Sequence, residues 1–299
     1  MKPRSFRADL LPKIRDLEIE AKQQVLSAMI SGEWISRMRG HGIEFAGYRQ
    51  YTTGDDASLI DWKASLRSRR LVIKELQEEK NLNVYMFLDV SDTMLCGTTD
   101  KVKSEYAAEV ASSLAFAALH MGENVSLALW SDHVTRFMPL GNGVAYHHQI
   151  TRQILDIAHY GGVKDIAHST RQLLAVMPTP GLIMLITDAV GFDAAWEHNL
   201  KVMATKHDLI LIVVRDPRDR RLPAHGEFVL EDPTTGQKLV VDAADYAQPY
   251  AAFVAAEEER ISALVRSAGA DLIMLETSSP YKDIVRQAFV QRKRRWWRV

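Results

Sequence analysis

The pattern of apolar and polar residues changes character near residue 82. Before that point, residues 8–30 carry apolar side chains near helical spacing, and two short apolar stretches, 43–51 and 71–76, are typical of strands. After it, unbroken apolar runs recur between longer segments. Continuous runs of this kind are typical of strands covered on both faces, as in parallel α/β sheets. The runs lie at residues 84–88, 125–130, 182–186, 209–214 and 272–275.

The segments between these runs have helical periodicity. Strands that alternate with helices form βαβ units, and a series of such units forms a doubly wound, mostly parallel sheet of the Rossmann type. Residues 134–138 follow the second run too closely for a crossover helix, so they are expected to form an antiparallel edge strand. The predicted helices occupy residues 102–121, 145–159, 166–177, 194–206, 246–268 and 281–291.

The chain is therefore expected to have two parts. Residues 1–80 form an N-terminal helix and a small strand-containing block, and residues 81–299 form the α/β domain. Two apolar stretches on either side of an Asp-Pro-Thr-Thr-Gly sequence predict a hairpin insertion near residues 226–242. The helix predicted over residues 102–121 is rich in Ala and Ser, which favours a buried helix lying close to the sheet.

Composition narrows the class of protein. With 47% hydrophobic and 25% charged residues, the chain has the composition of a soluble globular protein. A net charge of −1 argues against nucleic-acid binding, which needs a basic surface. The single cysteine, Cys96, excludes an internal disulfide and a cysteine-based zinc site. The chain begins without the apolar stretch of a secretory signal and has no apolar run of about 18 residues, so we expect a cytoplasmic location.

Oxygen-bearing side chains follow two of the predicted strands. Asp89, Ser91 and Thr93 come directly after the first apolar run, and Asp188 follows the run at 182–186. Ligands bind at the carboxyl ends of strands in open α/β sheets, particularly where the strand order reverses. Carboxylate and hydroxyl oxygens without imidazole suit Mg²⁺ or Mn²⁺. The four residues are therefore the predicted metal ligands.

Two groups of motifs carry a resemblance to known families. The sequence Asp-Val-Ser-Asp-Thr at 89–93, the pair Gly161-Gly162 and Leu-Ile-Thr-Asp at 185–188 resemble the metal-ion-dependent adhesion site of a von Willebrand factor A domain. The segment before this domain resembles the front block of the bacterial domain-of-unknown-function-58 family, in which such a block precedes an A-type domain. Its motifs are Tyr-Arg-Gln-Tyr at 48–51, Gly-Asp-Asp at 54–56, Ile-Asp-Trp-Lys at 60–63 and Leu-Val-Ile-Lys-Glu at 71–75.

The resemblance, which runs from about Gly40 to Glu276, implies a fold and a function. The implied strand order is 3-2-1-4-5-6, which places the strand ending at Asp89 beside the strand ending at Asp188. Similar short family members are non-enzymatic protein-binding modules, partners of MoxR-type AAA+ ATPases in protein assembly or remodelling. The implied site binds Mg²⁺ or Mn²⁺ with an open coordination position, which a client protein fills with an acidic residue.

One departure from the family pattern concerns the metal. The family commonly has Thr after its Gly-Gly pair, but here Val163 and Lys164 follow. Valine offers no oxygen, and the Lys164 ammonium could approach the same carboxylates, where it would compete with the ion or take over its charge. We therefore expect Mg²⁺ to bind weakly.

Two alternative functions stay open. In the first, the metal site is vestigial and the chain is a scaffold that binds through its hairpin and basic C-terminal tail. In the second and more remote one, Asp89 to Thr93 form the loop of a haloacid-dehalogenase-like phosphatase. The tail at 292–298 holds five basic residues and two tryptophans, so it is either a solvated terminus or a docking segment for an acidic partner or a peripheral membrane contact. The acidic cluster of Asp55, Asp56 and Asp61 predicts a salt-bridge network that locks the front block to the A-type domain, with a second metal site as the alternative.

Overall fold

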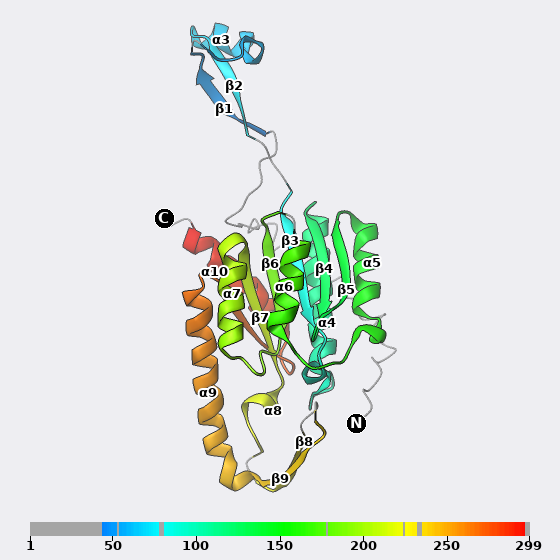
Figure 1. Ribbon diagram of the computed structural model, residues 1–299. Coiled ribbons are helices and arrows are strands. Elements are labelled where there is room, and N and C mark those ends of the chain that lie inside the picture. Colours follow the sequence, from blue (N-terminus) through cyan, green and yellow to red (C-terminus); the bar gives the residue numbers. More distant parts are fainter. Residues whose placement is uncertain are drawn as a thin grey trace. The chain divides into compact units, whose positions relative to one another are not determined.

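A computed structural model describes residues 44–52, 54–77, 81–177, 179–223, 225–231 and 235–296 (Figure 1). The chain divides into two compact units, of which the smaller is Arg39–Leu82 and the larger contains Asn83–Val299. The helix predicted for residues 8–30 lies outside the described residues.

The smaller unit is an antiparallel strand pair with one short helix. Strand β1 (Glu44–Gln50) pairs with β2 (Val72–Gln77), and helix α3 (Trp62–Ser68) lies between them in sequence. The two predicted strands of the front block are confirmed.

The acidic cluster of this unit holds local structure. Asp61 accepts hydrogen bonds from the Lys63 and Ala64 N–H groups and caps α3. Asp56 caps the 3₁₀ turn Ala57–Leu59 by accepting from the Ser58 N–H. Asp55 forms a bidentate ion pair with Arg49, both N–O distances being 2.7 Å, and this guanidinium holds the pKa of Asp55 well below its usual range. These contacts stabilise the turns of the unit itself, and a lock onto the larger domain stays a prediction.

The larger unit is built on a six-stranded sheet in the order β10-β7-β6-β3-β4-β5. Every neighbouring pair is parallel except β4 and β5, which are antiparallel. In order along the chain these strands are 3-2-1-4-5-6, so the predicted doubly wound α/β fold, its strand order and its antiparallel edge strand are confirmed. The strands are β3 (Asn83–Asp89), β4 (Asn124–Trp130), β5 (Val134–Gly141), β6 (Leu182–Thr187), β7 (Asp208–Arg215) and β10 (Asp271–Glu276).

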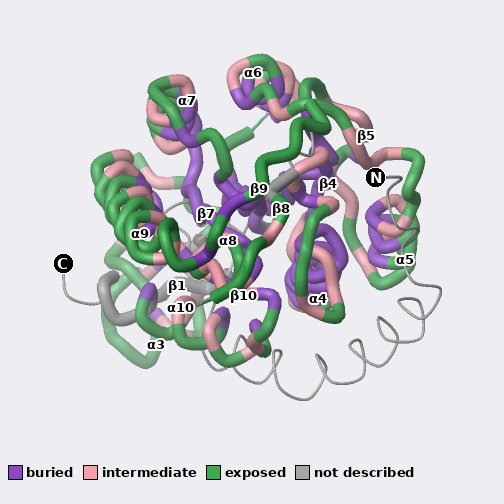
Figure 2. The backbone as a smooth tube through the Cα atoms, turned by 90° about the horizontal axis from the view of Figure 1, so that it is seen from below, coloured by how far each residue is buried: buried purple, intermediate pink, exposed green. Residues whose placement is uncertain are grey.

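Helices cover both faces of this sheet, and the central strands are buried between them (Figure 2). On one face lie α6 (Ile166–Val176), α7 (Ala194–Lys206) and α9 (Ala243–Ser267), whose side chains form one core cluster with alternate residues of the strands. On the other lie α4 (Lys103–His120), α5 (Val144–Ile154) and α10 (Tyr281–Trp296). The short α8 (Pro217–Arg220) and the hairpin of β8 (Glu227–Glu231) and β9 (Lys238–Asp242) complete the unit and confirm the predicted hairpin.

Three helix boundaries differ from their predicted positions by more than one residue, two of them because of side-chain caps. The helix predicted over 145–159 ends at Ile154, because Asp156 accepts from the Ala158 N–H and starts a separate 3₁₀ turn. Helix α9 begins three residues earlier than predicted, where Asp242 caps it by accepting from the Ala244 N–H. Helix α10 continues past the predicted end at residue 291 as far as Trp296.

Helix α4 is buried along nearly its whole length, as its composition predicted. Every residue from Lys103 to Leu119 is buried, and the alanines at 107, 108, 111, 115, 117 and 118 have no exposed surface. Because their side chains are single methyl groups, the helix backbone packs close to the sheet. Within the described part of the chain, no helix is both long and apolar enough to cross a membrane.

We predict that Ala111→Leu destabilises the domain by about 1–3 kcal/mol, because the added carbons have no space between α4 and its neighbours. Ala255→Leu, on the exposed side of α9, is the matched control and should change stability by less than about 0.5 kcal/mol. Urea unfolding of both variants measures the difference. Equal stabilities would show that α4 is not tightly packed.

Candidate functional site

The predicted site lies where strands β3 and β6 end beside each other. The two strands pair in parallel with Leu88 opposite Ile186, so Asp89 and Asp188 meet at the switch in strand order. Both carboxylates are fully buried. The Thr187 hydroxyl donates a hydrogen bond of 2.6 Å to Asp89 Oδ2 and ties the two strand ends together. The structure therefore brings together the two acidic residues that the sequence predicted.

The loop after β3 supplies the two predicted hydroxyls. Asp89 Oδ1 accepts a hydrogen bond of 2.9 Å from the Ser91 N–H. The hydroxyl oxygens of Ser91 and Thr93 lie 3.2 Å apart and hydrogen-bond to each other. All four predicted ligands thus belong to one region.

The glycine pair that carried the family resemblance lies against this loop. Asp92 donates its N–H to the Gly162 carbonyl at 3.0 Å, and its carboxylate accepts from the Gly162 N–H at 3.1 Å. Gly162 has a φ of +98°, and a Cβ there would lie 3.0 Å from Ser131 Oγ. The backbone conformation therefore favours glycine at this position, and a Cβ would crowd the Ser131 hydroxyl.

Lys164, two residues after Gly162, reaches the centre of the site. Its Nζ lies 2.7 Å from Asp89 Oδ2, forms an ion pair with Asp188 Oδ1, and lies 3.4 Å from Thr187 Oγ1. The Lys164 side chain is only 8% exposed. The expectation that this ammonium approaches both carboxylates is confirmed.

A second lysine, which the sequence reasoning missed, lies on the other side of Asp188. Lys103 is the first residue of α4, and its Nζ lies 2.9 Å from Asp188 Oδ2 and 3.1 Å from Asp219 Oδ2. A lysine at a helix N-terminus opposes the helix dipole, and a buried charge needs a partner. The sequence did contain one sign of this role, since Lys103 lies at the start of a helix that is otherwise rich in small residues.

Together these residues form an ion-pair chain, Asp89–Lys164–Asp188–Lys103–Asp219, in which carboxylates and ammonium groups alternate. Burial alone would lower the pKa of Lys164 and of Lys103, but the neighbouring carboxylates raise the pKa of both above the usual value. Burial alone would raise the pKa of Asp188, but the two ammonium groups hold it well below its usual range. At neutral pH both lysines and Asp188 are therefore charged.

The arrangement does not fit a divalent ion bound at the same oxygens. Mg²⁺ needs a near-ideal octahedron of oxygens at about 2.0–2.1 Å. Lys164 already contacts one oxygen of each carboxylate, and Val163, where the family has Thr, adds no ligand. A divalent ion about 4 Å from the ammonium would be repelled by about 8 kcal/mol at an effective dielectric constant of 20. Among the described residues, no group of three or more His, Cys, Asp or Glu side chains could hold a metal. Mg²⁺ or Mn²⁺ binding therefore stays a prediction, and it requires Lys164 to move away.

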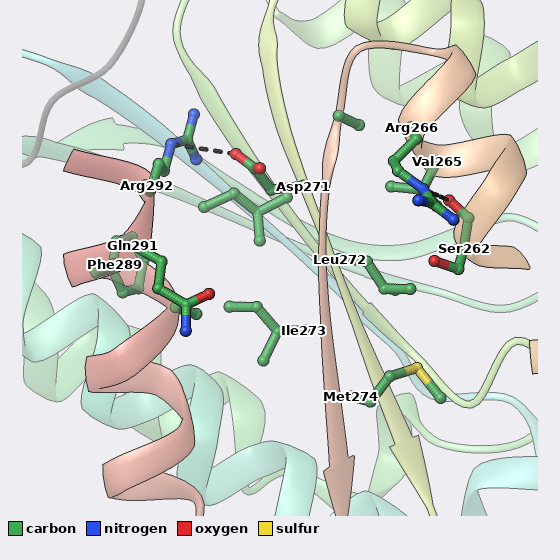
Figure 3. Close-up of a pocket in the computed structure, with 13 residues that line it drawn as sticks. Ser262, Val265, Arg266, Asp271, Leu272, Ile273, Met274, Phe289, Gln291 and Arg292 are labelled. Atoms are coloured by element: carbon green, nitrogen blue, oxygen red, sulfur yellow. Dashed lines mark hydrogen bonds and ion pairs between the residues drawn. The ribbon is translucent and has the colours of Figure 1, made fainter. Parts of the chain in front are cut away.

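A separate hollow lies at the opposite end of the sheet, where the strands begin. It is lined by residues of β10, α9 and α10, including Asp271 and Arg292 (Figure 3). Arg292 is buried and forms ion pairs with Asp208 and Asp271, at the starts of β7 and β10. The first residue of the predicted basic tail thus fastens α10 to the sheet. The side chains of residues 293–299 lie outside the described part, so the tail's contacts stay a prediction.

A known family pattern covers most of the chain. The model of the family described as "Protein of unknown function DUF58" matches residues 47–260. The chain belongs to this family. The match includes most of the front block as well as the strands that end at Asp89 and Asp188, so the two groups of motifs belong to one family pattern.

Curated proteins that are similar in sequence to this DUF58 chain come from mycobacteria. Uncharacterized proteins of Mycobacterium tuberculosis and Mycobacterium bovis are 27% identical over 291 residues, which cover 96% of this chain and 90% of theirs. An uncharacterized protein of Mycobacterium avium is 35% identical over 118 residues, which cover 38% of this chain and 68% of that protein.

Two solved structures are also similar. BatB from Bacteroides thetaiotaomicron aligns with a TM-score of 0.47 and 14% identity, over 72% of this chain and 100% of that chain. A von Willebrand factor type A protein from Catenulispora acidiphila aligns with a TM-score of 0.37 and 12% identity, over 46% of this chain and 34% of that chain. At these levels the two structures carry no argument about what this chain binds.

We predict that Lys103→Met destabilises the domain by about 3–5 kcal/mol, because it leaves Asp188 and Asp219 with one ammonium fewer in a buried setting. Lys201→Met is the control. It removes an exposed i,i+4 pair with Glu197 and should cost less than about 1 kcal/mol. Chemical unfolding of both variants provides the measurement, and similar losses would mean that the ion-pair chain does not stabilise the fold.

Proposed function

We propose that this DUF58 protein is a non-enzymatic protein-binding module that acts with a MoxR-type AAA+ ATPase and a client protein in protein assembly or remodelling. The observation that carries the proposal is the ion-pair chain at the switch in strand order. It fills the position where open α/β sheets bind ligands, and its three carboxylates and two ammonium groups are already paired with one another. A site of this kind is suited to holding a binding surface in shape.

The same contacts argue against hydrolytic chemistry at Asp89. A phosphatase of the remote alternative needs this aspartate as a nucleophile and a carboxyl group two residues later as a general acid. Asp89 Oδ2 accepts from Thr187 and contacts Lys164, Oδ1 accepts from the Ser91 N–H, and residue 91 is Ser. Neither the nucleophile nor the acid is therefore available in this arrangement.

Two exposed valines flank the ion-pair chain and offer a surface for a protein partner. Val163 precedes Lys164 and is 55% exposed, and Val190 follows Asp188 by two residues and is 38% exposed. The Val190 N–H donates to Asp188 Oδ1 at 3.1 Å. Between Asp188 and Val190, Ala189 is buried with a φ of +53°, a conformation that non-glycine residues rarely adopt. We call the surface formed by Val163 and Val190 the rim of the site. The strained backbone at Ala189 fixes the position of Val190 in this rim, which supports a binding role for it.

The proposed partners rest on the resemblance to short family members described in the sequence analysis. A MoxR-type ATPase and its client are proposed on that ground, together with the cytoplasmic location that such an ATPase implies. An acidic residue on the client is proposed only for a site that holds a metal ion, since this residue would complete the coordination of the ion.

We predict that full-length protein retains a MoxR-type AAA+ ATPase from a native lysate of its source organism. The double variant Val163→Asp/Val190→Asp should retain at least about tenfold less, equivalent to about 1.4 kcal/mol, because charge replaces the exposed apolar rim. Val202→Asp, at a 36% exposed valine on α7, is the control and should retain as much as the wild type.

Mass spectrometry of the retained proteins, with and without Mg²⁺ and chelator, is the readout. Absence of such an ATPase under all conditions would contradict the partner, and equal retention by the rim variant would contradict the proposed surface. Phosphate release from phosphomonoesters by wild type but not by Asp89→Asn would establish the phosphatase alternative instead.

A second candidate is the scaffold with a vestigial metal site, and the hairpin favours it. Val229, Leu239 and Val240 of β8 and β9 are 57%, 62% and 64% exposed. Three large apolar side chains on one two-stranded hairpin form a surface suited to protein contact.

The scaffold candidate predicts that Leu239→Asp/Val240→Asp lowers retention of the ATPase at least about tenfold while the rim variant has no effect. The same retention assay compares them, and circular dichroism verifies that both variants fold. Loss with the rim variant alone would exclude the hairpin as the main contact.

A further inference from the structure

We propose that Lys164 and Lys103 permanently supply the charge that a divalent cation would supply at this site, so that the site works without metal. This inference deepens the proposed function, on which it rests for the use of the site. Its test measures cation binding by the protein alone, so it does not depend on finding the partner.

Two ammonium groups lie against the two carboxylates of the site. Lys164 Nζ contacts Asp89 Oδ2, at 2.7 Å, and Asp188 Oδ1, so it lies between the two carboxylates that a shared ion would bridge. Lys103 Nζ lies 2.9 Å from the remaining oxygen, Asp188 Oδ2. Three of the four carboxylate oxygens thus contact an ammonium group, and the fourth, Asp89 Oδ1, accepts from a backbone N–H.

The two lysines together supply as much positive charge as a divalent ion. Asp89 and Asp188 together carry two negative charges, which one divalent ion would neutralise. Lys164 and Lys103 supply two positive charges, so Asp89 and Asp188 need no divalent ion between them. Lys103 also pairs with Asp219, so the ion-pair chain as a whole keeps one negative charge. Both lysine side chains are nearly buried, at 8% and 3% exposed, which protects these pairs from screening by salt.

Lys164 uses all of its hydrogen-bond donors within the site. An ammonium group has three N–H donors. Those of Lys164 are matched by three acceptors, Asp89 Oδ2, Asp188 Oδ1 and Thr187 Oγ1. A bound metal would leave a coordination position for a partner's carboxylate, whereas this ammonium has no donor left to offer. A partner must therefore bind the surrounding rim.

Two neighbouring residues of the sequence agree with the replacement of a metal ion by lysine. Val163 takes the place of the family's metal-ligating Thr, and its side chain is 55% exposed to solvent. Lys164 follows directly and is brought to the carboxylates by the Gly162 loop, which Asp92 holds through both its N–H and its carboxylate. The loss of an oxygen ligand and the gain of a charge thus occur in adjacent residues.

Titration calorimetry with MgCl₂ on the full-length protein tests the inference. We expect a dissociation constant above about 10 mM for the wild type and below about 1 mM for Val163→Thr/Lys164→Ala, which restores an oxygen and removes the ammonium. Lys201→Ala, at the exposed pair with Glu197, is the control and should behave as the wild type.

A wild-type dissociation constant below about 10 mM would overturn the inference, since the lysines would not then occupy the ion's place. A second measurement does not require a variant to fold. Lysine-selective acylation, read by mass spectrometry, should leave Lys164 and Lys103 unreactive in the wild type at every Mg²⁺ concentration, while Lys201 reacts. Release of Lys164 to the reagent on adding Mg²⁺ would equally overturn it. Failure to retain an ATPase would leave both results unaffected.

Discussion

The ammonium of Lys164 between Asp89 and Asp188 is the interaction on which the carboxyl edge of the sheet depends. The two carboxylates end neighbouring parallel strands and are fully buried, so they would repel each other without a cation between them. Two unit charges about 4 Å apart interact by about 4 kcal/mol at an effective dielectric constant of 20, which is a large fraction of the stability of a typical domain. The lysine converts this repulsion into attraction.

The same requirement links the site to the packing of the domain. Helix α4 is buried along its length, and its first residue, Lys103, connects Asp188 to Asp219 of α8. Asp219 in turn accepts from the Asp216 N–H at the end of β7. Charges from two strand ends, the loop before α6 and two helices are thus joined in one chain. The exposed residues Val163 and Val190 are attached to this chain by adjacent backbone. The surface proposed to bind a partner has its shape because the charges beneath it are paired.

The central sheet, the two aspartates of the site and the role of Lys164 could be predicted from the sequence. The apolar runs that become β3, β6 and β7 are continuous because both faces of the sheet are covered, so they stand out from the helices between them. Asp89 and Asp188 follow such runs directly, so the fold alone brought them together, and the proximity of Lys164 in sequence to the glycine pair indicated its role. Lys103 and Asp219 could not be found in this way. Their meeting depends on how α4 and α8 approach the strand ends, and no local sequence pattern links residues so far apart in the chain. Some helix ends also differ from their predicted positions, because single capping residues such as Asp156 and Asp242 determine where a helix begins or ends.

The most direct test of this account is a crystal structure of the protein grown in MnCl₂, with anomalous scattering recorded for manganese. The account predicts no anomalous peak between Asp89 and Asp188, and density for Lys164 Nζ within hydrogen-bonding distance of both carboxylates. A manganese peak about 2.2 Å from oxygens of Asp89, Ser91 or Asp188, with the Lys164 side chain turned away, would contradict it.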